Sequence, residues 1–269
     1  MNKRYAFFLF LAVFLLAVFF RYADFFKPGQ SLFVAIFEDP SPKVGFYPWL
    51  VESTRQLRNS HFPLWCNLEG AGMPLLANYQ SSPFNPFNLV FVIFPSLRLL
   101  DFVILLKLTL LAVFTYLFAS SLGLSSLSAI ASALLICFCG FVSKNINLNS
   151  VNYWLPASLL LAEKILKSQG NLTRMIFLGI VVALEIIGVN PQAAFYFLLY
   201  ILAYSIVCGG LKKKREILVI IFGLGIGVSL NLVQILSFIE YIGFSWNYHY
   251  GPARAFDQLP LRWFFSLFF

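Results

Sequence analysis

Long apolar segments separated by short polar gaps run through most of this chain, and they limit strongly what it can fold into. Of its 269 residues, 60% are hydrophobic and 11% are charged, whereas soluble domains carry about 25% charged residues. A helix that crosses a bilayer needs about 20 apolar residues. The apolar segments cover residues 5–23, 97–120, 126–143, 153–168, 173–189, 192–209 and 217–239, and a further one begins near 261. The sequence therefore predicts an all-α polytopic integral membrane protein.

The charge pattern predicts the orientation of these segments. Lys3 and Arg4 precede an apolar run from Tyr5 to Phe20 that ends without a small-residue cleavage site, so we expect an uncleaved first span. If the N-terminus is cytoplasmic, the loops on the same side are 121–125, 169–172 and 210–216. The basic residues near these loops are Lys164, Lys167, Arg174, Lys212, Lys213, Lys214 and Arg215. Because cytoplasmic loops are rich in Lys and Arg, the sequence predicts a cytoplasmic N-terminus.

One membrane domain over residues 1–269 accounts for the pattern, with about seven transmembrane helices and a truncated eighth. We expect the chain to continue beyond Phe269, because the last apolar run is too short to span. A long extracytoplasmic loop covers about 24–96, and apolar positions on one helical face predict an interfacial helix at 46–59. Residues 84–95 are apolar but short and bounded by prolines, which favours a re-entrant or surface-lying piece.

Several other classes of protein are not supported. The net charge of +8 comes from residues near loops, and no arginine-rich stripe indicates nucleic acid as a partner. The two histidines and four cysteines are too scattered for a metal-ligand spacing or a disulfide framework, so neither a metal site nor a certain cofactor is predicted. Gly223, Gly225 and Gly227 lie in an apolar segment, where close helix packing is the plain interpretation.

Two charged residues stand inside apolar runs. Lys107 lies about ten residues past the outer start of its predicted helix, and Glu185 lies about five before an outer end. Charges inside a bilayer usually face a cavity or each other. One interpretation is that Lys107 meets a lipid phosphate while Glu185 orients it or contacts a sugar. The other is a structural ion pair, or a Lys107 that reaches toward the surface.

Four motifs of the long loop resemble a known family. They are Phe46-Tyr47-Pro48-Trp49, Pro63-Leu64-Trp65, residues 72–81 from Gly72 to Ser81, and Asn85-Pro86-Phe87-Asn88-Leu89. With the Asn190-Pro191-Gln192 turn and residues 234–245, they resemble the bacterial YfhO-like membrane proteins, which are GT-C type polyprenyl-sugar-dependent glycosyltransferases. The resemblance implies a GT-C-like helical bundle, of which this chain is the N-terminal part. It also implies a catalytic acid in the first extracytoplasmic loop.

The candidate site residues follow from this resemblance and from the chemistry of sugar transfer. A base must take the proton of the acceptor hydroxyl, and Asp39, with Glu38 as neighbour or substitute, is the candidate; the alternative is that Glu38-Asp39-Pro40 is only a polar turn. The candidates for substrate binding are Lys107, Glu185, Gln80, Asn190, Gln192, Glu240, Trp65 and Arg254. For Trp65 an interfacial aromatic belt, and for Glu240 plain solvent exposure, are the alternatives.

The predicted function is transfer of a sugar from a polyprenyl-phosphate carrier to a cell-envelope polymer or glycolipid on the outer face of the bacterial cytoplasmic membrane. The expected partners are the lipid bilayer, the lipid-linked sugar and that acceptor. A transporter or flippase for a lipid-linked sugar is one alternative, and it predicts helices broken at the bilayer midplane. A non-catalytic component of envelope assembly is the other, and it predicts that the acidic residues are dispensable.

Overall fold

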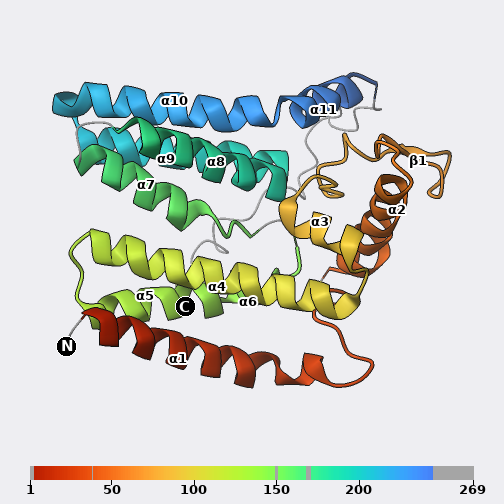
Figure 1. The fold of residues 1–269 in the computed structure, drawn as a ribbon, viewed down its shortest axis with the longest axis horizontal. Helices are drawn as coiled ribbons and strands as arrows, with labels where there is room; N and C mark the ends of the chain where they lie inside the picture. Colours follow the sequence, from red (N-terminus) through yellow and green to blue (C-terminus); the bar gives the residue numbers. More distant parts are fainter. Residues whose placement is uncertain (1–2, 38, 149–150, 168–170, 245–269) are drawn as a thin grey trace, which may run out of the picture.

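The computed structural model describes residues 3–37, 39–148, 151–167 and 171–244, and in these ranges the chain is mostly helical (Figure 1). The longer helices are α1 (Lys3–Tyr22), α2 (Tyr47–Arg58), α3 (Pro86–Ile93), α4 (Leu97–Ser121), α5 (Ser126–Phe138), α7 (Leu155–Lys167), α8 (Leu172–Gly188), α9 (Pro191–Gly209), α10 (Lys214–Leu230) and α11 (Leu232–Phe244). The short elements are α6 (Gly140–Lys144), η1 (Ala23–Phe26), η2 (Pro42–Phe46), η3 (Leu211–Lys213), β1 (Trp65–Cys66) and β2 (Met73–Pro74). This mostly helical architecture confirms the all-α part of the fold prediction.

The helices form two packed groups that α4 and α7 join. In the first group, α1, α4 and α5 enclose a core in which the rings of Phe10 and Tyr116 stack with centroids 4.9 Å apart. The second group consists of α7, α8, α9 and α10 around Leu178, Val182 and Ile201. Large apolar side chains also face outward, and Phe20 of α1 is 73% exposed. Such outward apolar surface is what a lipid-facing helix presents.

Four helical stretches are long and apolar enough to cross a membrane: Tyr5–Phe26, Leu97–Ser121, Ser126–Lys144 and Pro191–Gly209. The predicted spans 153–168 and 173–189 are helices of 13 and 17 residues, α7 and α8, and neither passes that test of length and composition. The predicted segment 217–239 is wrong as one straight helix. It divides into α10 and α11, which meet at Asn231 with a bend of 67°.

The bend has a local cause at Asn231. Its side-chain amide donates to the carbonyl of Gly227 (3.0 Å) and to that of Ala183 in α8 (3.1 Å). A side chain that bonds to helix carbonyls and to a neighbouring helix is a known origin of sharp bends. At about 1.5 Å per residue, the 17 residues of α10 extend about 25 Å before the bend. The bend therefore comes after α10 has run nearly the thickness of a hydrocarbon core, about 30 Å.

The two ends of the helical body differ in character. At one end lie the start of α1, the α4–α5 turn, the α7–α8 ends and the α9–α10 turn, which carry the basic residues that the charge pattern singled out (Figure 1). Three of these cations bond to main-chain carbonyls: Lys167 to Ser121, Arg174 to Lys164, and Lys213 to Leu166. The opposite end carries α2, the β1–β2 hairpin, α3 and α11. We call this end the loop layer.

Local sequence signals explain the ends of several elements. Asn85, Ser125, Asn171 and Asn190 each cap a helix by accepting a hydrogen bond from a main-chain N–H of its first turn. After Asn190 comes a proline at the first helical position of α9, as the sequence predicts. A helix, α2, is present where one is predicted at 46–59, and its position at the membrane interface stays a prediction. The short segment 84–95 contains the eight-residue α3.

Candidate functional site

A groove lies in the loop layer between the β1–β2 hairpin and α11. It has a volume of about 590 Å³, and its walls include Trp65, Met73, Leu76, Ser237, Glu240 and Tyr241. The carboxylate of Glu240 is exposed, and the ring of Trp65 is half-exposed. Ligand pockets in proteins commonly measure about 300–1,000 Å³ and combine apolar walls with a few polar groups. The groove thus offers flat aromatic surface, an apolar wall and one carboxylate.

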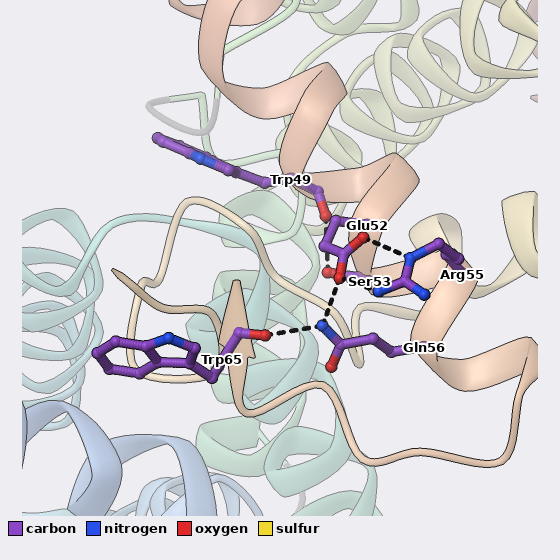
Figure 2. A network of polar contacts seen from close by, with 6 residues as sticks. All are labelled: Trp49, Glu52, Ser53, Arg55, Gln56 and Trp65. Atoms are coloured by element: carbon purple, nitrogen blue, oxygen red, sulfur yellow. Dashed lines mark hydrogen bonds and ion pairs between the residues drawn. The ribbon is translucent and has the colours of Figure 1, made fainter. Parts of the chain in front are cut away.

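A network of polar contacts around the buried Glu52 carboxylate positions Trp65 at this groove (Figure 2). Arg55 donates two hydrogen bonds to the Glu52 carboxylate, each 2.7 Å long, and Gln56 donates to the same carboxylate at 2.7 Å. The Gln56 amide also donates to the main-chain carbonyl of Trp65 at 2.7 Å. Helix α2 therefore holds strand β1 through Glu52, and the arginine keeps the pKa of the Glu52 carboxyl below its usual value. This carboxylate anchors the hairpin and is not free to act as a base.

Gly72 provides the space that the Trp65 indole occupies. A Cβ added at Gly72 would lie 2.4 Å from the indole Nε1, and the backbone φ of +98° there is one that side-chain-bearing residues rarely adopt. The hairpin partner Met73 follows directly, paired with Cys66. Both features explain a glycine at this point of the loop, and both keep the indole against the groove.

A second, smaller cavity lies around Lys107, and we call it the Lys107 chamber. Its volume is about 30 Å³, and its polar lining comes from Lys107, Gln80, Ser81, Asn88, Asn147 and Tyr153. The Lys107 ammonium lies 5.3 Å from the centroid of the Phe87 ring and 5.9 Å from that of Tyr153. These are distances at which a cation is attracted to an aromatic face.

Glu185 is buried on the other side of α7 and does not pair with Lys107. Its carboxylate accepts one hydrogen bond from the Asn152 amide and another, 2.9 Å long, from the Ser158 hydroxyl. Among the residues that the structure describes, no salt bridge joins Glu185 to Lys107. The structural ion pair that the sequence left open is therefore wrong.

The remaining predicted site residues do not converge on one cavity. Asp39 is exposed, and its carboxylate accepts a hydrogen bond of 2.8 Å from the main-chain N–H of Ser41, which with the Ser41 side chain holds the Asp39 pKa below its usual value. Asn190 caps α9, accepting from the Ala193 N–H at 2.8 Å, and the Gln192 side chain is exposed. The candidates Glu38 and Arg254 lie outside the described residues.

The predicted residues that do meet a cavity fall into two sets. Gln80 and Lys107 line the Lys107 chamber, whereas Trp65 and Glu240 line the groove. One segment of the loop, residues 75–81, contributes to both, with Leu76 in the groove wall and Gln80 in the chamber. The predicted residues that meet a cavity are therefore divided between two cavities on either side of one loop segment.

Two buried carboxylates of the loop layer were missed at the sequence level. Glu52 had a usable signal, because Arg55 and Gln56 follow it at helical spacings of three and four. Asp101 had none. Its carboxylate accepts from the Ser31 hydroxyl at 2.7 Å and the Phe33 N–H at 2.9 Å, both about 70 residues away in the chain. Both groups hold loop segments in place.

No group of three or more His, Cys, Asp or Glu side chains that could hold a metal ion occurs within the described ranges. Comparisons with protein-family models, with curated proteins and with solved structures find no match to this chain. The resemblance to YfhO-like glycosyltransferases stays a prediction from the loop motifs.

Proposed function

We propose that this chain belongs to a polytopic membrane glycosyltransferase that moves a sugar from a polyprenyl-phosphate carrier to a cell-envelope acceptor on the outer face of the bacterial cytoplasmic membrane. The four long apolar helices support insertion in a membrane. The basic residues at the end opposite the loop layer support a cytoplasmic N-terminus, with the loop layer outside. The acceptor and the donor sugar would then meet in the loop layer.

The observation that carries this proposal is the groove beside α11. Aromatic rings such as Trp65 and Tyr241 suit the apolar faces of sugar rings, and the exposed Glu240 carboxylate stands in the same wall. In the proposed reaction an acceptor hydroxyl attacks the anomeric carbon, and its proton passes to Glu240. The bond from the anomeric carbon to the phosphate oxygen breaks, and its electron pair leaves with the polyprenyl phosphate.

Glu240 replaces Asp39 as the candidate base for a geometric reason. A base must lie within hydrogen-bonding reach of the proton that it removes. Asp39 lines neither cavity, and its carboxylate is bonded to its own turn through Ser41. The alternative interpretation of Asp39, a polar turn that opens the loop, fits this bond.

The test is an in vitro transfer assay with the full-length protein in detergent micelles and a panel of radiolabelled polyprenyl-phosphate hexoses. Release of polyprenyl phosphate is measured with and without an envelope extract, so that hydrolysis to water is detected even when the acceptor is missing. We expect Glu240→Gln to lower the rate by about 100-fold or more, as the loss of a general base does. Asp39→Asn and the control Glu216→Gln, at the basic end, should stay near the wild-type rate.

Two results would contradict the proposal. If the wild-type protein turns over no member of the panel, the proposed transferase activity is wrong. If Glu240→Gln keeps the wild-type rate, the groove is not the reaction site. If all acidic variants also keep their function in cells, the non-catalytic role in envelope assembly is the better interpretation.

A transporter of lipid-linked sugars is the second candidate, and the bend between α10 and α11 favours it. Broken helices at the bilayer midplane form the substrate sites of many transporters. The position of this bend weighs against the idea, since about 25 Å of helix precede it. Reconstitution in liposomes separates the two: a transporter moves a fluorescent lipid-linked sugar across the bilayer without breaking its sugar–phosphate bond.

A further inference from the structure

Lys107 lies deep within α4, far from the loop-layer end of the helix. It is the eleventh residue of α4, so its Cα is about 15 Å along the helix from the loop-layer end. Leu106 and Leu108 flank it, and Ile104 shares the wall of the chamber. A charged side chain at such a place is costly, and proteins that keep one usually give it a partner or a task.

The described part of the chain provides no anionic partner for this ammonium. No carboxylate lies within salt-bridge distance of Lys107, and the buried carboxylate of Glu185 is already held by Asn152 and Ser158. Within the described ranges the cation lies over the Phe87 and Tyr153 rings. Lys107 itself lines the chamber.

Three other polar side chains of the chamber donate their hydrogen bonds to main-chain carbonyls. The Asn147 amide N–H₂ donates to the carbonyls of Leu32, Phe33 and Ala35. Tyr153 donates its hydroxyl proton to the Ile146 carbonyl at 2.6 Å, and Asn88 donates to the Ser82 carbonyl at 3.1 Å. These bonds hold the walls in place. The chamber is thus a preformed pocket whose lining includes one positively charged side chain, the ammonium of Lys107.

We propose that the Lys107 chamber binds a phosphate group. Lysine binds phosphate as a point charge with several donors, and the chamber of about 30 Å³ has space for about two water-sized atoms. Two phosphate oxygens fill this space, and the ester bond leads out past Gln80, whose side chain reaches the surface. The phosphate comes either from a lipid-linked substrate or from free inorganic phosphate.

The lipid-linked source rests on the proposed function, whereas the phosphate site itself does not. Segment 75–81 forms a wall of both the chamber and the groove. A polyprenyl phosphate held at Lys107 would leave the chamber past Gln80, in the same segment whose Leu76 lines the groove together with Trp65 and Glu240. In this arrangement Lys107 neutralises the departing phosphate while the carboxylate acts on the acceptor.

Trp154, next to Tyr153 of the chamber wall, is a natural reporter of this region. Its ring stacks on Phe87, with centroids 5.9 Å apart and planes at 21°, and Phe87 is the nearer of the two rings that face Lys107. Binding of an anion at the ammonium should change the fluorescence of this indole. The difference between the wild type and Trp154→Phe isolates its signal from those of the other tryptophans.

The experiment titrates the full-length protein in micelles with geranyl phosphate, with geraniol and with inorganic phosphate, reading the Trp154 emission. We expect Lys107→Met to weaken geranyl phosphate binding at least tenfold and to leave geraniol binding unchanged. The matched control is Lys43→Met, which removes the same charge from an exposed position of the loop layer and should change the affinity less than twofold.

The outcomes separate the sources of the phosphate. Geranyl phosphate that binds much more tightly than inorganic phosphate supports the lipid-linked source; equal affinities, both lost in Lys107→Met, support a free phosphate site. Equal binding in the wild type and Lys107→Met overturns the proposal. The wild type alone also tests the proposal if Lys107→Met does not fold. A Trp154 emission that neither geranyl phosphate nor inorganic phosphate changes would overturn the proposal. If no phosphate binds at Lys107 but the protein still transfers sugar at the normal rate, the phosphate site is wrong and the proposed function is not affected.

Discussion

The close approach of α8 and α10 makes a quantitative prediction about Gly227. A Cβ at this position would lie 2.4 Å from Val182 Cγ1 and 3.0 Å from the Gly179 carbonyl oxygen. Ordinary contacts begin near 3.4 Å, so the two helices would have to separate by about 1 Å in Gly227→Ala. Overpacking of this kind costs about 1–3 kcal/mol.

The neighbouring Gly225 is a matched control for this substitution. It lies in the same helix two residues earlier, and a Cβ there would meet nothing within 4 Å. Both substitutions gain the same helix propensity, about 1 kcal/mol relative to glycine, which cancels in the comparison. We therefore expect Gly227→Ala to be about 1–3 kcal/mol less stable than Gly225→Ala.

The assay is equilibrium unfolding of the purified protein in mixed micelles by added sodium dodecyl sulfate, followed by circular dichroism. Val182→Ala in the Gly227→Ala background should recover part of the loss, because it removes the nearest clashing atom. If Gly227→Ala proves as stable as Gly225→Ala, the close packing of α8 on α10 is wrong.

Two further predictions concern the buried carboxylates and use the same unfolding assay. Ser158→Ala removes one of the two donors to Glu185, so stability should fall by about 1–3 kcal/mol; an unchanged midpoint would show that this carboxylate is not held as described. Arg55 depresses the pKa of Glu52, so this pair stabilises the folded chain above the unfolded-state pKa and loses that contribution as the pH falls through the lower folded-state pKa. Between about pH 5 and pH 3 the wild type should therefore lose more stability than Glu52→Gln, and parallel pH profiles would contradict this.

The sequence predicted the elements whose signals are local. Apolar runs located α1, α4 and α9, and the amphipathic pattern located α2. These features depend on residues within one or two turns of each other, so the chain carries them without reference to its tertiary structure.

Features that depend on distant partners could not be predicted in the same way. The 67° bend at Asn231 involves a carbonyl of α8, 48 residues away in the chain. Asp101 finds its partners in residues 31–33. Two opposite charges inside apolar runs, Lys107 and Glu185, suggested an ion pair. Their positions along two helices do not determine whether the two side chains face each other. The neutral donors Asn152 and Ser158 occupy Glu185 instead.

The charged residues in and near the loop layer differ in whether they have a salt-bridge partner. This difference separates residues that stabilise the fold from candidate functional ones. Glu52 is buried and paired, so its partners repay the loss of hydration. Lys107 and Glu240 have no salt bridge within the described part of the chain, yet both face a cavity. A buried charge without a partner lowers stability, so a fold that retains one does so for a reason other than stability. The sign of the mutational effect follows: Glu52→Gln should weaken the fold, whereas Lys107→Met should leave its stability unchanged or raise it while phosphate binding is lost. A Lys107→Met protein that is destabilised as much as Glu52→Gln would make Lys107 a structural residue.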